Sequence, residues 1–305
     1  MPQSANDNPR RLVVVRALWR MSRPDQIALV VVVFGVGAAA ATALGGEPTA
    51  DAFALGLMAV ITTAMSVHIV NEYADAETDA LTRRTAFSGG SGALQQYGLP
   101  PRMALRWAAG AGVASLAVTV VAVTLESLSA TAALILGLGL LGGWQYSVRP
   151  LAFSRHGVGE IANALLGGLL LPLFGVAAVV GTVSLEDAVL FVPFTLLVFV
   201  NLLETQWPDR AADSHGGKAT LVTRMSPRAV RLLAAACTLT AYGVLPPATP
   251  MPIPVQVSVS SAAALPVSLW ALWRITRVES PLPAVLAMLT MIVAQGVVWI
   301  YLATA

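Results

Sequence analysis

Nine apolar segments follow one another along this chain of 305 residues. They are residues 27–45, 52–73, 103–124, 129–146, 159–180, 187–205, 229–245, 255–273 and 283–303. A helix needs about 20 mostly apolar residues to cross the hydrocarbon core of a bilayer, which is close to the length of these segments. Only 11% of the residues are charged, against roughly 25% in soluble domains. We therefore predict an all-α polytopic membrane protein, with nine transmembrane helices in a single domain over residues 1–305.

The basic residues are distributed unevenly between the two sides of this predicted bundle. When the connections are assigned alternately to the two sides, all 18 Lys and Arg residues fall on the side of the polar N-terminal segment 1–24. Basic connections stay in the cytoplasm, so the pattern predicts an N-terminus inside and a multi-pass protein of the cytoplasmic membrane. Two long polar loops, about 74–102 and 206–228, lie on this side, where function is expected.

Partners other than the lipid bilayer are constrained by the same residues. No basic run with interleaved aromatic residues occurs, so nucleic acid is not a predicted partner, and no feature indicates an obligate protein partner. Pro266 predicts a kink in the eighth segment. The Gly137/Gly139 and Gly167/Gly168 pairs predict either close helix contacts or the wall of an apolar groove.

A first acidic cluster lies at the inner end of the second segment. Asn71, Asp75 and Asp79 recur every four residues, so on a helix they share one face. His68 and Glu72 lie on or beside that face. Charged side chains at this depth are costly, and they normally face a bundle interior or a water-filled cavity.

A second acidic cluster lies at the inner end of the sixth segment. Asn201, Thr205, Asp209 and Asp213 repeat the spacing of four residues, and Pro208 is expected to end or kink the helix. Because both clusters follow even-numbered segments, both are predicted on the same membrane face. The two halves of the chain therefore have the pattern of a parallel internal repeat.

Two facing sets of carboxylate and amide oxygens suit magnesium, which binds one or two carboxylates together with substrate phosphates. We therefore predict a central cavity, open to the cytoplasmic side, that holds Mg²⁺ and a diphosphate. The plainer alternative is that these acids cap helix ends in loop water. A secondary transporter is the alternative from another class, although transporter sites tend to lie at broken helices of inverted repeats near mid-membrane.

The two clusters resemble the motifs of the UbiA superfamily of intramembrane prenyltransferases. The family motif NDxxDxxxD is matched by residues 71–79, with Glu72 in place of the usual Asp. The second motif, DxxxD followed by Gly-Lys and Thr-Leu, is matched by Asp209, Asp213 and residues 217–221. Nine helices with both motifs on the cytoplasmic side are also the plan of that family.

Three stretches are similar to the branch that prenylates 1,4-dihydroxy-2-naphthoate in menaquinone synthesis. They are Ser-Gly-Gly-Ser-Gly at 88–92, residues 145–150 with 156–160, and the Gly-Lys-Ala-Thr-Leu tail at 217–221. This resemblance implies an aromatic acceptor. A hydroxybenzoate, a homogentisate-type phenol, or a glyceryl phosphate ether as in archaeal lipid synthesis remain alternatives.

The resemblance implies transfer of a polyprenyl group from an isoprenyl diphosphate, with Mg²⁺ as cofactor. The residues expected to hold the magnesium and diphosphate are Asn71, Asp75, Asp79, Asp209 and Asp213, the four aspartates being catalytic. The residues expected to bind substrate are Asn71, Asn201, Lys218, Arg149, Tyr146, Arg23 and His68.

Several of these substrate contacts have a second interpretation. Arg149 could instead set the topology, and Tyr146, with Trp144, could be an interfacial aromatic residue rather than a partner of the allyl cation. His68 could make a satisfied polar contact rather than orient a ligand or the acceptor. Arg23, which precedes Pro24, could anchor the chain rather than meet the acceptor's carboxylate.

Overall fold

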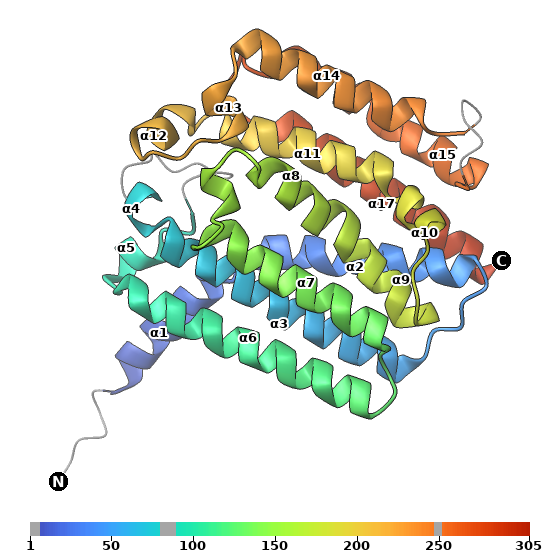
Figure 1. The fold of residues 1–305 in the computed structure, drawn as a ribbon, viewed down its shortest axis with the longest axis horizontal. Coiled ribbons are helices and arrows are strands. Elements are labelled where there is room, and N and C mark those ends of the chain that lie inside the picture. The colour runs from blue at the N-terminus through green and yellow to red at the C-terminus, as the bar shows by residue number, and fades with distance from the viewer. Residues whose placement is uncertain (1–6, 80–89, 247–251) are drawn as a thin grey trace.

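The computed structural model describes residues 7–79, 90–246 and 252–305, and within these ranges the chain is helical without strands. Long helices run side by side in one bundle, with short helices at its ends (Figure 1). The long helices and helical segments are α1 (Asp7–Met21), α2 (Pro24–Ala43), α3 (Ala50–Ala74), α6 (Pro101–Thr124), α7 (Ala130–Ser147), α8 (Gly159–Asn163) with η2 (Ala164–Leu170) and α9 (Leu171–Val180), α11 (Val192–Gln206), α14 (Pro227–Gly243), α15 (Val255–Ser261) with η3 (Ala262–Ala264) and α16 (Leu265–Arg274), and α17 (Leu282–Thr304). The short elements are α4 (Ala76–Asp79), α5 (Ala93–Tyr97), η1 (Phe153–Arg155), α10 (Leu185–Leu190), α12 (Arg210–His215) and α13 (Leu221–Arg224).

Each of the nine predicted apolar segments is helical in the structure. Six helices of the described ranges are long and apolar enough to cross a membrane: Pro24–Ala43, Ala50–Ala74, Pro101–Thr124, Gly159–Val180, Val255–Arg274 and Leu282–Thr304. A shorter apolar helix, α11, carries the second acidic cluster at its end. The structure thus supports a multi-pass membrane protein, whereas the count of nine spans stays a prediction.

Prolines explain two irregular stretches within the spans. The short 3₁₀ turn η3 separates α15 from α16, and Pro266 lies in the first turn of α16. The π-helical stretch η2 lies directly before α9, whose first turn contains Pro172. Proline lacks the amide hydrogen and crowds the preceding turn, so the backbone before it departs from α-helical hydrogen bonding. The predicted interruption at Pro266 is therefore confirmed, and the one at Pro172 was not predicted.

Glycines allow α2 and α9 to pack with their backbones in contact. A Cβ atom on Gly37 would overlap the carbonyl oxygen of Pro172, and one on Gly175 would overlap the carbonyl oxygen of Phe34. Small residues at such crossings are typical of membrane helix pairs, where close backbone approach supplies much of the packing.

The glycine contacts predicted from sequence are confirmed at one position. A Cβ atom on Gly168 would lie 2.7 Å from the Cα atom of Thr195, so this glycine is needed for the contact with α11. Gly137, Gly139 and Gly167 have open space around the Cβ position, so they are not sites of close helix approach.

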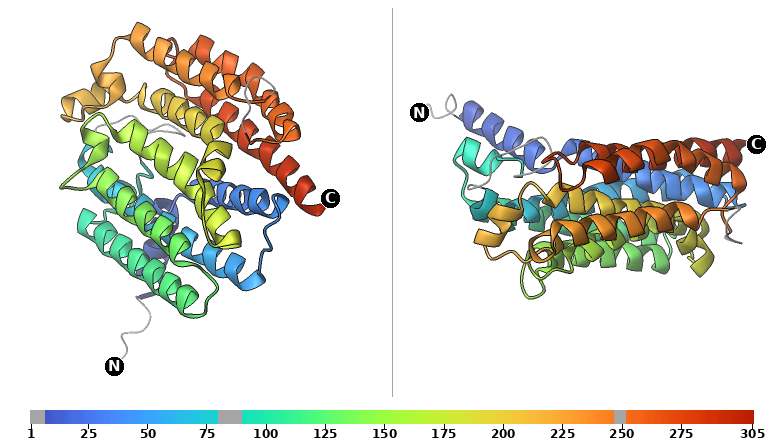
Figure 2. Two further views of the ribbon diagram at one scale, coloured as in Figure 1. Left: turned by 45° about the vertical axis from the view of Figure 1, so that its right-hand side comes forward. Right: turned by 90° about the horizontal axis from the view of Figure 1, so that it is seen from above.

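The described parts of both polar loops lie at one end of the bundle. In Figure 1 the short helices α4, α5, α12 and α13 gather at the end opposite α10 and the C-terminal end of α17. The views in Figure 2 show the long helices running roughly parallel to one another between these ends. The N-terminal segment 1–24, predicted only as a polar lead, contains α1, whose Ala17 and Met21 are fully buried in a cluster with Ile69 and Val70 of α3. The first acidic cluster is therefore packed against α1 as well as against the bundle.

Candidate active site

The first motif begins in the last turn of α3 and ends in α4. Asn71 and Glu72 belong to α3, Asp75 caps the C-terminus of this helix, and Asp79 ends α4. The helix is interrupted at Asp75, yet the amide of Asp75 donates to the Asn71 carbonyl at 2.9 Å and the amide of Asp79 donates to the Asp75 carbonyl at 2.8 Å. The side chain of Thr78 donates to the same Asp75 carbonyl at 3.0 Å. The spacing of four residues is therefore maintained by hydrogen bonds across the break.

The second motif forms a compact turn after α11. This helix ends at Gln206, directly before Trp207 and Pro208, as the proline predicts. Asp209 lies at the N-terminal cap of α12, and the amide of Asp213 donates to its carbonyl at 2.8 Å. The amide of Lys218 then donates to the Asp213 carbonyl at 2.8 Å, which returns the chain toward the motif after the Gly-Gly pair.

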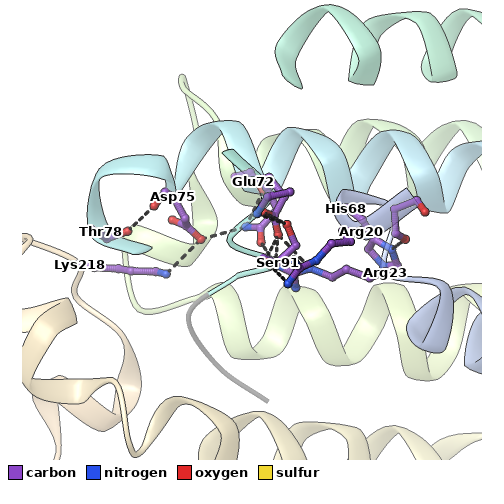
Figure 3. Close-up of polar contacts among 12 residues, drawn as sticks. Arg20, Arg23, His68, Glu72, Asp75, Thr78, Ser91 and Lys218 are labelled. Atoms are coloured by element: carbon purple, nitrogen blue, oxygen red, sulfur yellow. Dashed lines mark hydrogen bonds and ion pairs between the residues drawn. The ribbon is translucent and has the colours of Figure 1, made fainter. Parts of the chain in front are cut away.

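The two motifs meet at Lys218. Its Nζ atom lies 3.5 Å from Oδ2 of Asp75 and 3.8 Å from Oδ1 of Asp213, so one ammonium group contacts a carboxylate from each half of the chain. Figure 3 shows Lys218 pointing toward Asp75 at the end of α3. A Cβ atom on Gly216 would lie 3.0 Å from a side-chain carbon of Thr78, so the backbone of the second motif loop also packs closely against a side chain of the first.

The charges in this site are buried and coupled. Burial, reinforced by the nearby carboxylates of Asp75 and Glu72, raises the pKa of the Asp79 carboxyl to about 7. Burial also raises the pKa of Asp213 to about 6, although the Lys218 ammonium partly offsets this. Burial disfavours the charged form of Lys218, but Asp75 and Asp213 outweigh it and raise the pKa of this ammonium. Lys218 therefore stays protonated. Its single positive charge does not neutralise all the carboxylates of the site.

Glu72 and Arg23 form a buried ion pair beside the first motif. The Nη2 atom of Arg23 lies 2.7 Å from Oε1 of Glu72, and Nε donates to the same oxygen at 3.2 Å. The backbone amide and hydroxyl of Ser91 donate to the two Glu72 oxygens at 2.8 Å and 2.6 Å. The Arg23 guanidinium is therefore engaged by Glu72, and its predicted contact with an acceptor's carboxylate stays a prediction.

The other predicted substrate contacts have different surroundings. Tyr146 of α7 is among the groups that act electrostatically on Lys218, so it lies beside the motifs. Nδ1 of His68 lies 2.9 Å from the carbonyl of Ser22, which matches the interpretation of a satisfied polar contact. Asn201 lies in α11, and its buried amide oxygen has no hydrogen-bond partner among the described residues. Trp144 donates its indole N–H to the Ser66 hydroxyl at 2.9 Å.

Arg149 lies at the surface, in a cleft that borders the second motif. It is exposed and forms no ion pair with the motif carboxylates among the residues described. Together with Arg155, His156 and Arg224 it lines an open polar cleft of about 560 Å³ next to Gly217. The predicted contact of Arg149 with a diphosphate therefore stays a prediction.

The sequence profile of the UbiA prenyltransferase family matches residues 29–301. The chain belongs to the UbiA prenyltransferase family. The expected enzyme class is thereby confirmed at the level of the family, and the transporter alternative is not retained.

Solved structures of UbiA homologues share the fold. A homologue from Archaeoglobus fulgidus bound to GPP and Mg²⁺ is 18% identical, with a TM-score of 0.66 over 93% of this chain and 99% of that chain. An apo homologue from Aeropyrum pernix K1 is 18% identical, with a TM-score of 0.67 over 88% and 96%. A structure of digeranylgeranylglyceryl phosphate synthase is 13% identical, with a TM-score of 0.65 over 95% and 98%. No curated protein sequence matches the chain.

Several residues of this UbiA family site were not singled out from sequence. The Ser147 hydroxyl accepts a hydrogen bond from Asn71 at 3.3 Å, and Arg155 donates to the carbonyl of Ala74 at 3.2 Å. Glu160 is fully buried, and its Oε1 atom accepts the backbone amide of Leu221 at 2.6 Å. Ser147 and Glu160 belong to the stretches 145–150 and 156–160 that already carried the resemblance, whereas no local pattern marks Arg155.

The donor set fits a hard divalent cation. Asp75, Asp79 and Asp213 present carboxylate oxygens at one end of the bundle, and two of them have raised pKa values, as expected for acids that lack a neutralising cation. Within the described ranges no three His, Cys, Asp or Glu side chains already surround a single point. Lys218 lies between the carboxylates of Asp75 and Asp213 instead, so these side chains would have to rearrange around the ion to hold Mg²⁺.

Proposed function

We propose that this protein transfers a polyprenyl group from an isoprenyl diphosphate to an aromatic acceptor in a magnesium-dependent reaction. The observation that carries the proposal is the position of Lys218, whose ammonium pairs with Asp75 of the first motif and Asp213 of the second. Both halves of the chain contribute a carboxylate to this site. Binding of a metal-bound diphosphate between the two motifs would need the same arrangement. The homologue of the same fold that was solved with GPP and Mg²⁺ supports the proposal.

The proposal includes the orientation of the bundle. Nine helices cross the cytoplasmic membrane with the N-terminus inside, and the cavity between them opens at the end that carries α4 and α12. Two observations support this arrangement: the Lys and Arg residues fall on one side when the nine segments are alternated, and both motifs lie at one end of the bundle (Figure 1). Fusing a reporter to each predicted connection tests the orientation directly.

Each motif residue has a defined part in the proposed reaction. Asp75, Asp79, Asp209 and Asp213, with Asn71, hold the magnesium and the diphosphate. Bound Mg²⁺ supplies neutralisation of the negative charge that develops on the departing pyrophosphate. Lys218 is already charged and buried, so it can add a fixed positive charge to the same oxygens.

Further side chains would keep the reaction on course. Tyr146 presents an aromatic ring beside the motifs, where it could steady an allylic cation. Asn201 offers a buried amide oxygen that could accept a hydrogen bond from the acceptor. The apolar helices exclude water from the carbon that becomes electron-deficient, which protects it from hydrolysis.

We place the acceptor in the class of 1,4-dihydroxy-2-naphthoate, which connects the protein to quinone biosynthesis. The stretches at 88–92, 145–150 with 156–160, and 217–221 support this choice. Hydroxybenzoate and glyceryl phosphate ether are the alternatives, the latter corresponding to archaeal lipid synthesis.

The test uses purified protein in lipid nanodiscs with radiolabelled geranylgeranyl diphosphate and each acceptor in turn, with Mg²⁺ or with EDTA. We expect a prenylated product with the naphthoate acceptor in Mg²⁺ and none in EDTA. Asp75→Asn and Asp213→Asn should abolish transfer, whereas Asp51→Asn, an exposed carboxylate in the first turn of α3, should not. If only another acceptor is prenylated, the assignment of the naphthoate acceptor is wrong. If transfer persists in EDTA, the proposed magnesium site is wrong.

A further inference from the structure

Glu72 occupies the position of the first motif that usually carries an aspartate, and its carboxylate is 3% exposed. Its Oε1 atom accepts hydrogen bonds from Nε and Nη2 of Arg23 and from the backbone amide of Ser91. Its Oε2 atom accepts the Ser91 hydroxyl at 2.6 Å. A carboxylate has about four acceptor positions, two on each oxygen, so these contacts saturate Oε1 and occupy one of the two positions on Oε2.

The partners of Glu72 come from segments that are distant in the sequence. Arg23 lies between α1 and α2 with φ of 52°, a left-handed conformation that an arginine adopts rarely. Arg20, in the last turn of α1, donates to the Ser91 carbonyl at 3.1 Å and also bonds Gln96 of α5. Glu72 therefore joins the end of α3 to the α1–α2 connection and to the segment that leads into α5.

This network reaches the proposed metal ligands on two paths. Gly90 precedes Ser91 with φ of +62°, and a Cβ atom there would overlap the Asp79 carboxylate. The position of Ser91 thus sets how closely the backbone approaches Asp79.

On the second path, Nη2 of Arg23 lies 3.4 Å from Oδ1 of Asn71, and Nδ2 of Asn71 donates to Oδ2 of Asp75 at 3.0 Å. Glu72 binds the same guanidinium. The network therefore touches Asp75 through Asn71, and Asp79 through Gly90.

We propose that Glu72 is a positioning residue and not a metal ligand. With Arg23 it fixes Ser91 and Asn71, and these hold Asp79 and Asp75 in place. Figure 3 shows the basis for this assignment, since Lys218 reaches the end of α3 near Asp75 while Arg20 and Arg23 gather around Glu72. The inference rests on the metal site proposed above and assigns Glu72 a separate part in it.

The test compares Glu72→Gln, Glu72→Ala, Arg23→Gln and the double variant Arg23→Gln/Glu72→Ala with Asp75→Asn and Asp213→Asn. Manganese binding to the purified protein is followed by electron paramagnetic resonance, and hydrogen exchange is followed in peptides that cover residues 90–97. Glutamine can still accept from Arg23 and from the Ser91 amide, so Glu72→Gln should leave the manganese Kd within about threefold of wild type. Asp75→Asn and Asp213→Asn should each weaken it by roughly tenfold or more.

The remaining variants test the positioning role itself. Glu72→Ala should increase hydrogen exchange at 90–97 and raise the KM for geranylgeranyl diphosphate. Because the pair acts as a unit, the loss of kcat/KM in the double variant should be smaller than the product of the two single losses by roughly tenfold.

A manganese Kd that rises as much in Glu72→Gln as in Asp75→Asn would make Glu72 a ligand and overturn the inference. Independent, multiplicative losses for Arg23→Gln and Glu72→Ala would overturn it as well. If instead Asp75→Asn and Asp213→Asn leave manganese binding unchanged, the proposed metal site is itself wrong, which is a distinguishable outcome.

Discussion

Replacing Lys218 by methionine should change metal binding and prenyl transfer in opposite directions. In the structure the ammonium competes for the carboxylates of Asp75 and Asp213, which are the groups proposed to bind Mg²⁺. Its removal should therefore tighten binding of the metal alone. Its removal should also take away a fixed positive charge from the departing pyrophosphate, which slows transfer.

The magnitude of the first effect follows from the observed distance. Magnesium lies about 2.1 Å from a carboxylate oxygen, and Nζ of Lys218 lies 3.5 Å from Oδ2 of Asp75. An ion on that oxygen therefore lies no more than about 6 Å from Nζ, where a divalent ion and an ammonium repel by about 1.4 kcal/mol in the dielectric of water. The Kd for metal alone should fall by about tenfold. Loss of one preorganised charge-stabilising group lowers kcat by roughly a hundredfold to a thousandfold.

The two effects are measured on the same preparations. Manganese titration without substrate at about pH 8, where the carboxyls of the site are ionised, gives the Kd, and radiolabelled transfer at saturating metal gives kcat. Arg228→Met is the matched control, because it removes an exposed positive charge from the start of α14, outside the motifs. A Kd that rises in Lys218→Met, or a kcat that stays at the wild-type value, would refute the reasoning.

Three further predictions follow from the site and the helix packing. The pKa of Asp79 is about 7 and that of Asp213 about 6 without metal, so a metal ion must displace protons from these carboxyls at low pH. The manganese Kd should therefore fall by roughly tenfold or more between about pH 5.5 and pH 8. A Kd that does not change with pH would contradict these pKa values. Gly90→Ala should reduce transfer strongly by overlapping Asp79, whereas Gly98→Ala, which has a similar positive φ but open space around it, should not; equal activities in the two variants would contradict the contact. Gly175→Ala should lower the free energy of unfolding by about 1–3 kcal/mol in detergent titrations, since its Cβ overlaps the backbone of α2; unchanged stability would show that α9 can shift.

The helices were predictable because lipid exposure imposes a simple rule on composition. Apolar runs of sufficient length must become helices that satisfy their own backbone hydrogen bonds, and each predicted segment is helical in the structure. Helix α1 was not predicted, because its arginines interrupt the apolar residues. Ala17 and Met21 are its fully buried side chains among those described, and two such residues do not form a recognisable apolar pattern. Its place is set by packing on α3 and α5, which a local pattern does not contain.

The site was predictable as two sets of residue types and not as a set of contacts. The spacing of four residues in each motif is a local property, and the hydrogen bonds from Asp75 and Asp213 to the residues four positions earlier reproduce it. The pairing of Arg23 with Glu72 joins residues 49 positions apart, so it depends on how α1 meets α3. Likewise, the cleft that Arg149 shares with Gly217 and Arg224 joins residues that are distant in the sequence, so no local pattern could describe it.

Arg23 and Lys218 both form ion pairs with carboxylates of the first motif, but their electrostatic roles differ. Arg23 is held by Glu72 through two nitrogen atoms, so its charge is compensated whether or not a substrate is present. Lys218 instead shares its charge between Asp75 and Asp213 at ion-pair distances of 3.5 Å and 3.8 Å, and neither contact is a short hydrogen bond. Once those carboxylates are neutralised by other means, the ammonium loses its partners and must find another anion, because an unpaired buried charge is costly. In the proposed reaction a diphosphate brought to the same place supplies that anion, so we expect Lys218, which pairs with Asp75 and Asp213 without substrate, to bind the leaving group when substrate is present.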